Sequence, residues 1–221
     1  MILRALCLAL LALACPAHAA DCPGADAATY GLSVKTQNGD TWSFGAQLGS
    51  DGISAGIEGQ GHGTPLSGYS ISEGYKIFAL SEPLARRIAG PEVLADKRAV
   101  FASLEITGRG APATPNPGTF WTGKGKIEVS AQQQNWTTIP VATLPVQMRY
   151  DYLPLQDVVI SGCPYTVMPI EYRVTGADGE VLVKRRMIYF PLMDLAVITR
   201  WGPDAEGPER KTGITGLGYD N

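Results

Sequence analysis

The chain has 221 residues and a formal net charge of −3, and only 18% of its residues are charged. A balance this close to neutral implies no strong attraction to nucleic acid or to an anionic membrane. With 26 glycines and 16 prolines, the composition is typical of a turn-rich β protein rather than a helical one.

Residues 1–20 have the features of an export signal. Arg4 provides a positive start, residues 5–14 form an apolar core, and residues 17–19 (Ala-His-Ala) match the small-x-small cleavage pattern. The core is too short to span a bilayer. We therefore expect a cleaved product without a transmembrane segment, in the periplasm or outside the cell. The alternative is a lipoprotein anchored at Cys15, although alanine occupies the aliphatic position of that signal.

The cysteines predict one structural disulfide. Cys7 and Cys15 leave with the signal, so Cys22 and Cys163 allow a single intramolecular pairing. An exported protein meets an oxidising environment, in which such a pair is stable. The alternative, a redox pair or a thiol nucleophile, lacks the C-x-x-C spacing typical of that chemistry.

Alternation of apolar and polar residues predicts antiparallel strands along most of the chain. Asn38-Gly39 and Asp178-Gly179 are typical hairpin turns, because glycine accepts a positive φ. The glycine-rich residues 49–63 fit either two small-residue strands or an irregular loop. The predicted strands are residues 30–35, 41–48, 69–80, 100–107, 126–132, 142–150, 156–161, 165–175, 181–191 and 195–201.

One short helix is predicted over residues 82–89. Ser81 is a suitable N-cap, Pro83 fits the opening turn, and Gly90-Pro91 ends the pattern.

Two features bear on how the domain ends and where its edges lie. Pro169 cannot donate to a ladder, so its strand is expected at a sheet edge or at a bulge. Residues 202–221 are polar and rich in glycine and proline, which favours a loosely attached tail after a single β-rich domain at residues 21–201.

Catalytic signals are few, and we predict no catalytic residue, metal site or cofactor. Residues 52–56 match G-x-S-x-G around Ser54, but a poor helix former follows and His62 is the only histidine after the signal. A lone histidine cannot build a His-rich zinc site. A hydrolase would have to use Ser54, or paired carboxylates among Glu58, Glu73 and Glu105.

Residues 184–186 (Lys-Arg-Arg) form the densest basic run. On a strand these side chains alternate between faces, so Lys184 and Arg186 share one face, and Arg173 on the partner strand adds a third charge. Together they predict a site for an anionic ligand. The alternative, favoured by the excess of acids in this third of the chain, is an edge strand protected by charge against aggregation.

Residues 158–200 resemble uncharacterised bacterial exported β-rich proteins. The resemblance depends on residues 161–163 (Ser-Gly-Cys), 189–191 (Tyr-Phe-Pro) and 195–197 (Leu-Ala-Val). The acid and glycine common after the proline are replaced by Leu192-Met193. The resemblance implies an envelope protein and transfers no catalytic residue.

These observations predict a mainly β fold, an antiparallel sandwich or a strongly curved sheet with one short helical segment. We expect an exported, non-catalytic binding or envelope-accessory protein whose curved face holds a small apolar or anionic ligand. The alternatives are a secreted hydrolase, and an interaction module that pairs the Pro169 strand or the tail with an envelope protein.

Overall fold

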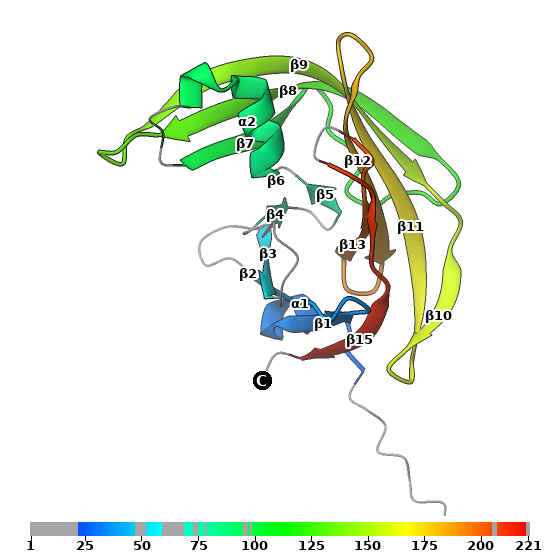
Figure 1. Cartoon of the computed structure of the whole chain (residues 1–221). Helices are drawn as coiled ribbons and strands as arrows, with labels where there is room; N and C mark the ends of the chain where they lie inside the picture. Colours follow the sequence, from blue (N-terminus) through cyan, green and yellow to red (C-terminus); the bar gives the residue numbers. More distant parts are fainter. Residues whose placement is uncertain are drawn as a thin grey trace, which may run out of the picture.

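The computed structural model describes residues 22–46, 52–58, 69–72, 75–77, 79–94, 97, 99–204 and 207–219. Two antiparallel sheets pack against each other, and the larger one bends into an arc around the smaller one (Figure 1). The predicted mainly β architecture with one short helix is confirmed. Within the described residues, no helix is long and apolar enough to cross a bilayer.

The smaller sheet has six strands in the order β15-β1-β2-β3-β4-β5. Its first hairpin turns at Gly39, which has a φ of +84°. Residues 52–58 form one strand, so the predicted glycine-rich segment is a strand there, and its remaining residues lie outside the described ones. The bounds are β1 Leu32–Thr36, β2 Thr41–Ala46, β3 Gly52–Glu58, β4 Tyr69–Ser72, β5 Lys76–Ile77 and β15 Ile214–Tyr219.

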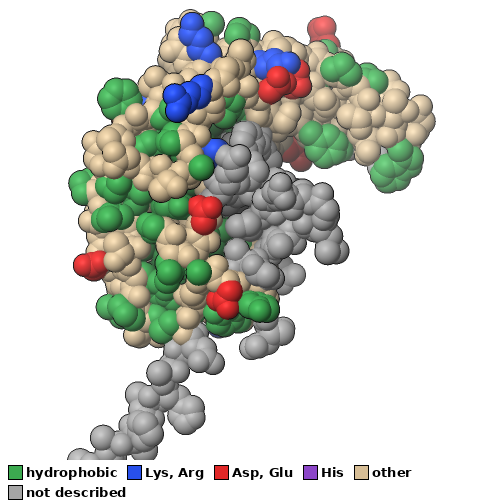
Figure 2. Space-filling view, turned by 180° about the vertical axis from the view of Figure 1, so that it is seen from behind, with side chains coloured by type: hydrophobic (Ala, Val, Ile, Leu, Met, Phe, Trp, Pro, Cys, Tyr) green, Lys and Arg blue, Asp and Glu red, His purple; other side chains and the backbone are tan. Residues whose placement is uncertain are grey.

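The larger sheet has nine strands in the order β14-β13-β12-β11-β9-β8-β7-β6, with β10 pairing to β11 alone. Strands β7 to β9 project as an arm that covers α2 (Figure 1). The arm is the projection at the upper right in the view from behind (Figure 2). The bounds are β6 Ala79–Leu80, β7 Ala99–Thr107, β8 Phe120–Gln132, β9 Thr138–Tyr152, β10 Gln156–Ile160, β11 Cys163–Gly176, β12 Val181–Phe190, β13 Leu195–Trp201 and β14 Arg210–Lys211.

The predicted helix is α2, Glu82–Ala89. The Ser81 hydroxyl accepts a hydrogen bond from the Leu84 amide at 3.4 Å, as an N-cap does. Leu84 is fully buried and packs the helix beneath the arm. The short helix α1 Ala27–Tyr30 was not predicted, and the 3-10 helix η1 Glu92–Leu94 follows α2 where one further turn is expected from residue 92.

The core between the two sheets is aromatic and contains a buried hydroxyl network. Trp42 of the smaller sheet meets Trp201 of the larger one with ring centroids 5.6 Å apart. Tyr75, fully buried, donates to the Pro112 carbonyl at 2.6 Å, and its hydroxyl lies 2.9 Å from that of Tyr152. Since buried polar groups need partners, these hydrogen bonds fix how the sheets meet.

Cys22 and Cys163 form the predicted disulfide, with Cα atoms 5.7 Å apart. Cys163 is buried at the first position of β11, whereas Cys22 is exposed. The bond therefore fastens the segment that leads into the smaller sheet onto β11, a central strand of the larger one.

Pro169 is not on an edge strand. β11 has β12 on one side and β10 followed by β9 on the other. The Pro169 carbonyl accepts from the Leu153 amide at 3.0 Å, on the side where residues 153–155 separate β9 from β10. In an antiparallel ladder a residue's N–H and C=O face the same neighbour, so the missing N–H falls at this interruption. The proline is accommodated by an irregularity in the adjacent strand.

The prediction of a loosely attached tail is wrong. β14 pairs with β13, and β15 pairs with β1 from Leu32↔Tyr219 to Thr36↔Ile214. Leu217 is buried in the core. Glycines alternate with apolar residues along this strand, so the segment is rich in glycine although it is part of a sheet. From composition alone such a segment cannot be distinguished from an unstructured terminus.

Candidate functional site

The basic run at residues 184–186 divides between the two faces of β12. Lys184 and Arg186 are half-buried on the outer face, and Arg185 points into the core with 2% of its surface exposed. The predicted alternation is therefore confirmed. β12 is not an edge strand, since β11 and β13 pair with it on both sides, so protection of a sheet edge does not explain its charges.

Strand register places three cations side by side across the outer face. Arg149 of β9 stands opposite Arg173 of β11, and Arg173 stands opposite Lys184 of β12. Directly opposite side chains have Cβ atoms about 5 Å apart, and like charges in such positions destabilise a sheet. The row of like charges therefore destabilises the folded protein, which suggests that the charges serve a purpose other than stability.

The next row along the same strands divides into an acidic and a basic half. Asp151 of β9 lies opposite Glu171 of β11. Glu171 lies opposite Arg186 of β12, which in turn lies opposite Arg200 of β13. Residues two apart on a strand share a face about 7 Å apart, so the two rows form one charged surface.

The outer members of this surface are already neutralised. The Arg149 guanidinium donates to Asp151 with N–O distances of 2.6 to 2.9 Å and lies over the Phe120 ring, 4.4 Å from its centroid. Asp151 raises the pKa of Arg149 mainly through these hydrogen bonds.

On the other side, Glu209 accepts from Arg200 at 2.9 Å and lies 2.8 Å from the Lys211 ammonium. Hydrogen bonds from Lys211 and Arg200 hold the pKa of Glu209 below its usual range. With these outer charges neutralised, the unneutralised charges lie at the centre of the surface.

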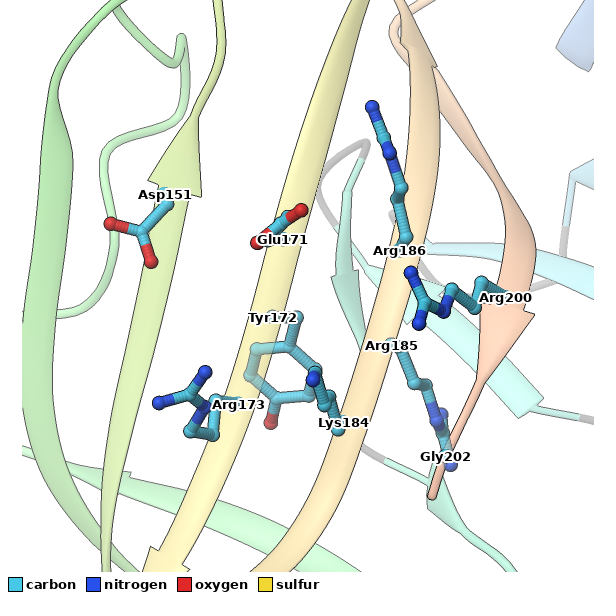
Figure 3. A pocket seen from close by; sticks show the side chains of 9 residues that line it. All are labelled: Asp151, Glu171, Tyr172, Arg173, Lys184, Arg185, Arg186, Arg200 and Gly202. Carbon is cyan, nitrogen blue, oxygen red and sulfur yellow. The ribbon is translucent and has the colours of Figure 1, made fainter. Parts of the chain in front are cut away.

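At the centre, Arg173, Lys184 and Arg186 form no side-chain ion pair with any described residue. These three side chains are called the cationic cluster below. They rise from adjacent strands, with Glu171 at the fourth corner (Figure 3). The structure thus brings together all three residues predicted to bind an anion.

The cationic cluster borders a small hollow. Its volume of about 20 Å³ is room for one water molecule, not for the body of a ligand. An anionic group would therefore rest on the surface between the guanidinium forks, which are suited to carboxylate and phosphate oxygens. The lining residues are Asp151, Glu171, Tyr172, Arg173, Lys184, Arg185, Arg186, Arg200 and Gly202.

The inner face of the arc is occupied by the protein itself. Trp42, Tyr75 and Leu84 from the smaller sheet, its connection and α2 fill it with side chains that are 1% exposed or less. These core positions therefore leave no room for the predicted apolar ligand, which stays a prediction for the rest of the curved face.

Among the described residues, those considered for a hydrolase are not brought together. Ser54 lies in the middle of β3, between Gly45 of β2 and Ser70 of β4, whereas a nucleophile elbow requires a sharp turn at the serine. The Glu105 carboxylate is 3.0 Å from the Lys126 ammonium, which also binds Glu128. His62, Glu73 and the side chain of Glu58 lie outside the described residues.

For metals, the described part of the chain has no group of three or more His, Cys, Asp or Glu side chains positioned to hold an ion.

Sequence reasoning missed the residues that complete the surface. The Arg149-x-Asp151 spacing is a readable signal, since residues two apart on a strand share a face. Arg200 could not be found, because a bulge between Arg186 and Met187 decides which residue of β13 it opposes.

Comparison with protein-family models, curated proteins and solved structures finds no match to this chain.

Proposed function

We propose that this is an exported, non-catalytic protein that binds an anionic ligand through the cationic cluster. The observation that supports the proposal is the placement of Arg173 opposite Lys184, beside Arg186, with no side-chain ion pair to any of the three among the described residues. The Asp204 carboxylate accepts from the backbone N–H of Lys184 at 2.6 Å, not from its ammonium. Adjacent like charges are unfavourable in the free protein, and an anion bound between them relieves that repulsion.

Export is supported by the Cys22–Cys163 bond and by the signal-like residues 1–20, and it agrees with the resemblance to bacterial exported proteins. Fractionation of the native host followed by mass measurement is the test. Protein that begins after residue 20 and lacks free thiols in an exported fraction would support export. Full-length protein confined to the cytosol would contradict it.

The binding proposal is tested by titrating the cleaved protein with inorganic phosphate at low salt, followed by backbone amide chemical shifts. Resonances of β11 and β12 around the cluster are expected to move. Replacing all three side chains (Arg173→Gln, Lys184→Gln and Arg186→Gln) should weaken binding at least tenfold, since each charge-assisted hydrogen bond contributes about 1.5 to 3 kcal/mol. Added sodium chloride should weaken binding in the unmodified protein by screening the exposed charges.

Lys124→Gln is the matched control. Lys124 is exposed on the same outer face, on β8, away from the cluster. It should bind phosphate as the unmodified protein does. Equal binding by the triple variant, or shifts confined to other strands, would contradict the proposal.

The same triple variant provides an independent readout without ligand. Because it removes like-charge neighbours, its melting temperature at low ionic strength should equal or exceed that of the unmodified protein. A clear loss of stability would mean that the three charges serve the fold rather than binding.

A further inference from the structure

Glu171 distinguishes this surface from a simple anion site. It is exposed at the fourth corner of the charged square, two residues before Arg173 and directly across from Arg186. It forms no ion pair with a described residue, although three cations surround it. Beside it, on the next strand, is a second carboxylate, that of Asp151.

A negative side chain at this position opposes a purely anionic ligand. At about 7 Å along the strand and about 5 Å across it, Glu171 repels any anion held by the cluster. A ligand that carries its own positive group beside its negative one turns that repulsion into attraction, because each end then faces the opposite charge.

Accepting the proposed function, we infer that the ligand is zwitterionic, a phosphate ester carrying a primary ammonium group. The phosphate lies on the cationic cluster, and the ammonium donates to Glu171. An ammonium has three N–H donors. Asp151 accepts from Arg149, but a carboxylate has about four acceptor positions, so Asp151 can take a further donor from the same group.

The size of the hollow indicates how much of the ligand is recognised. With room for about one water molecule, it encloses no part of the ligand, so only the charged groups that rest on the surface side chains are recognised. The rest of the ligand projects into solvent. The chemistry recognised is therefore a phosphoethanolamine group, whether free in solution or as the headgroup of a lipid.

The experiment compares inorganic phosphate, O-phosphoethanolamine and phosphocholine by calorimetry at one pH and ionic strength. We expect phosphoethanolamine to bind at least tenfold more tightly than phosphate. Phosphocholine should fall between them, because its quaternary nitrogen is charged but has no N–H to donate. Equal affinity for phosphate and phosphoethanolamine, or for phosphocholine and phosphoethanolamine, would overturn the inference.

Glu171→Gln is the decisive variant. It should remove the preference for phosphoethanolamine while leaving phosphate binding unchanged or stronger, since a repulsive charge is lost. Glu92→Gln, which replaces an exposed carboxylate on the distant η1 turn, is the matched control and should keep the preference. A preference that survives Glu171→Gln would overturn the inference.

The failures of the two proposals are distinguishable. If phosphate binds and the preference is absent, the zwitterion is wrong and the anion site remains. If none of the three ligands binds, the proposed function itself fails. Sedimentation with phosphatidylcholine vesicles, with and without phosphatidylethanolamine, then identifies the source. Binding that requires phosphatidylethanolamine indicates a lipid headgroup, and binding to the soluble compound alone indicates a free ligand.

Discussion

Removal of the Cys22–Cys163 bond is expected to cost a large part of the stability of the domain. The bond closes a loop with a sequence separation of 141. In the chain-entropy description, opening a loop of this length increases the entropy of the unfolded chain and lowers its free energy by about 5 kcal/mol at 25 °C. Typical domains unfold with 5 to 15 kcal/mol, so the variant should be marginal.

The assay is urea unfolding followed by the fluorescence of the four tryptophans. Cys22→Ala breaks the cross-link and keeps the buried sulfur of Cys163, whereas Cys22→Ala with Cys163→Ala also removes that sulfur from the core. The single variant therefore measures the cross-link, and the difference between the two measures the packing at Cys163. The unfolded single variant is less constrained and exposes more surface, so its m-value should rise.

The reasoning is refuted if Cys22→Ala lowers the free energy of unfolding by less than about 1 kcal/mol. An unchanged melting temperature of the unmodified protein in reductant, with both thiols shown to be free, would refute it as well.

Three further outcomes are expected from the core and its borders. Gly125→Ala should lower the free energy of unfolding by about 1 to 3 kcal/mol or more, because its Cβ would come within 2.3 Å of a β7 carbonyl oxygen. Gly110→Ala is the control: a Cβ there meets nothing within 4 Å, so its free energy of unfolding in the same urea assay should be nearly unchanged. Ser81→Ala should cost about 1 kcal/mol in urea unfolding through loss of the α2 N-cap, and an unchanged midpoint would show that the cap contributes nothing. Burial, chiefly, raises the pKa of Tyr75 and Tyr189, so the folded protein keeps protons that the unfolded chain loses above about pH 10, and each should lower the free energy of unfolding by about 1.4 kcal/mol per pH unit there. The phenolate absorbance should then rise together with unfolding, and a smooth titration of all tyrosines in the folded protein would contradict this.

Local patterns predicted the elements well because their causes are local. Residues 195–201 and 82–89 were bounded as the structure has them. The first is a short apolar run, and the second has a cap at Ser81 and a stop at Gly90. The strands of the arm, β8 and β9, are longer than predicted. The added residues, 120–125 of β8 and 138–141 of β9, are mostly exposed or half-buried, so the hydrophobic alternation is weak there.

What could not be predicted depends on pairings between distant segments. Nothing near residues 214–219 shows that they lie beside β1, almost two hundred residues earlier. The face of each basic residue followed from alternation, but the neighbours of Arg173 and Arg186 depend on register, on the bulge after Arg186 and on which strand lies beside β12. The sequence therefore predicted the members of the cationic cluster, and only the fold gives Glu171 its place among them.

The pairing of β15 with β1 has a consequence for the order of events during biosynthesis. β1 is synthesised first but can pair with β15 only at the end, because Leu32 lies beside Tyr219, which is made almost last. The smaller sheet is thus completed only after synthesis ends, which is compatible with the proposed export of the chain before it folds.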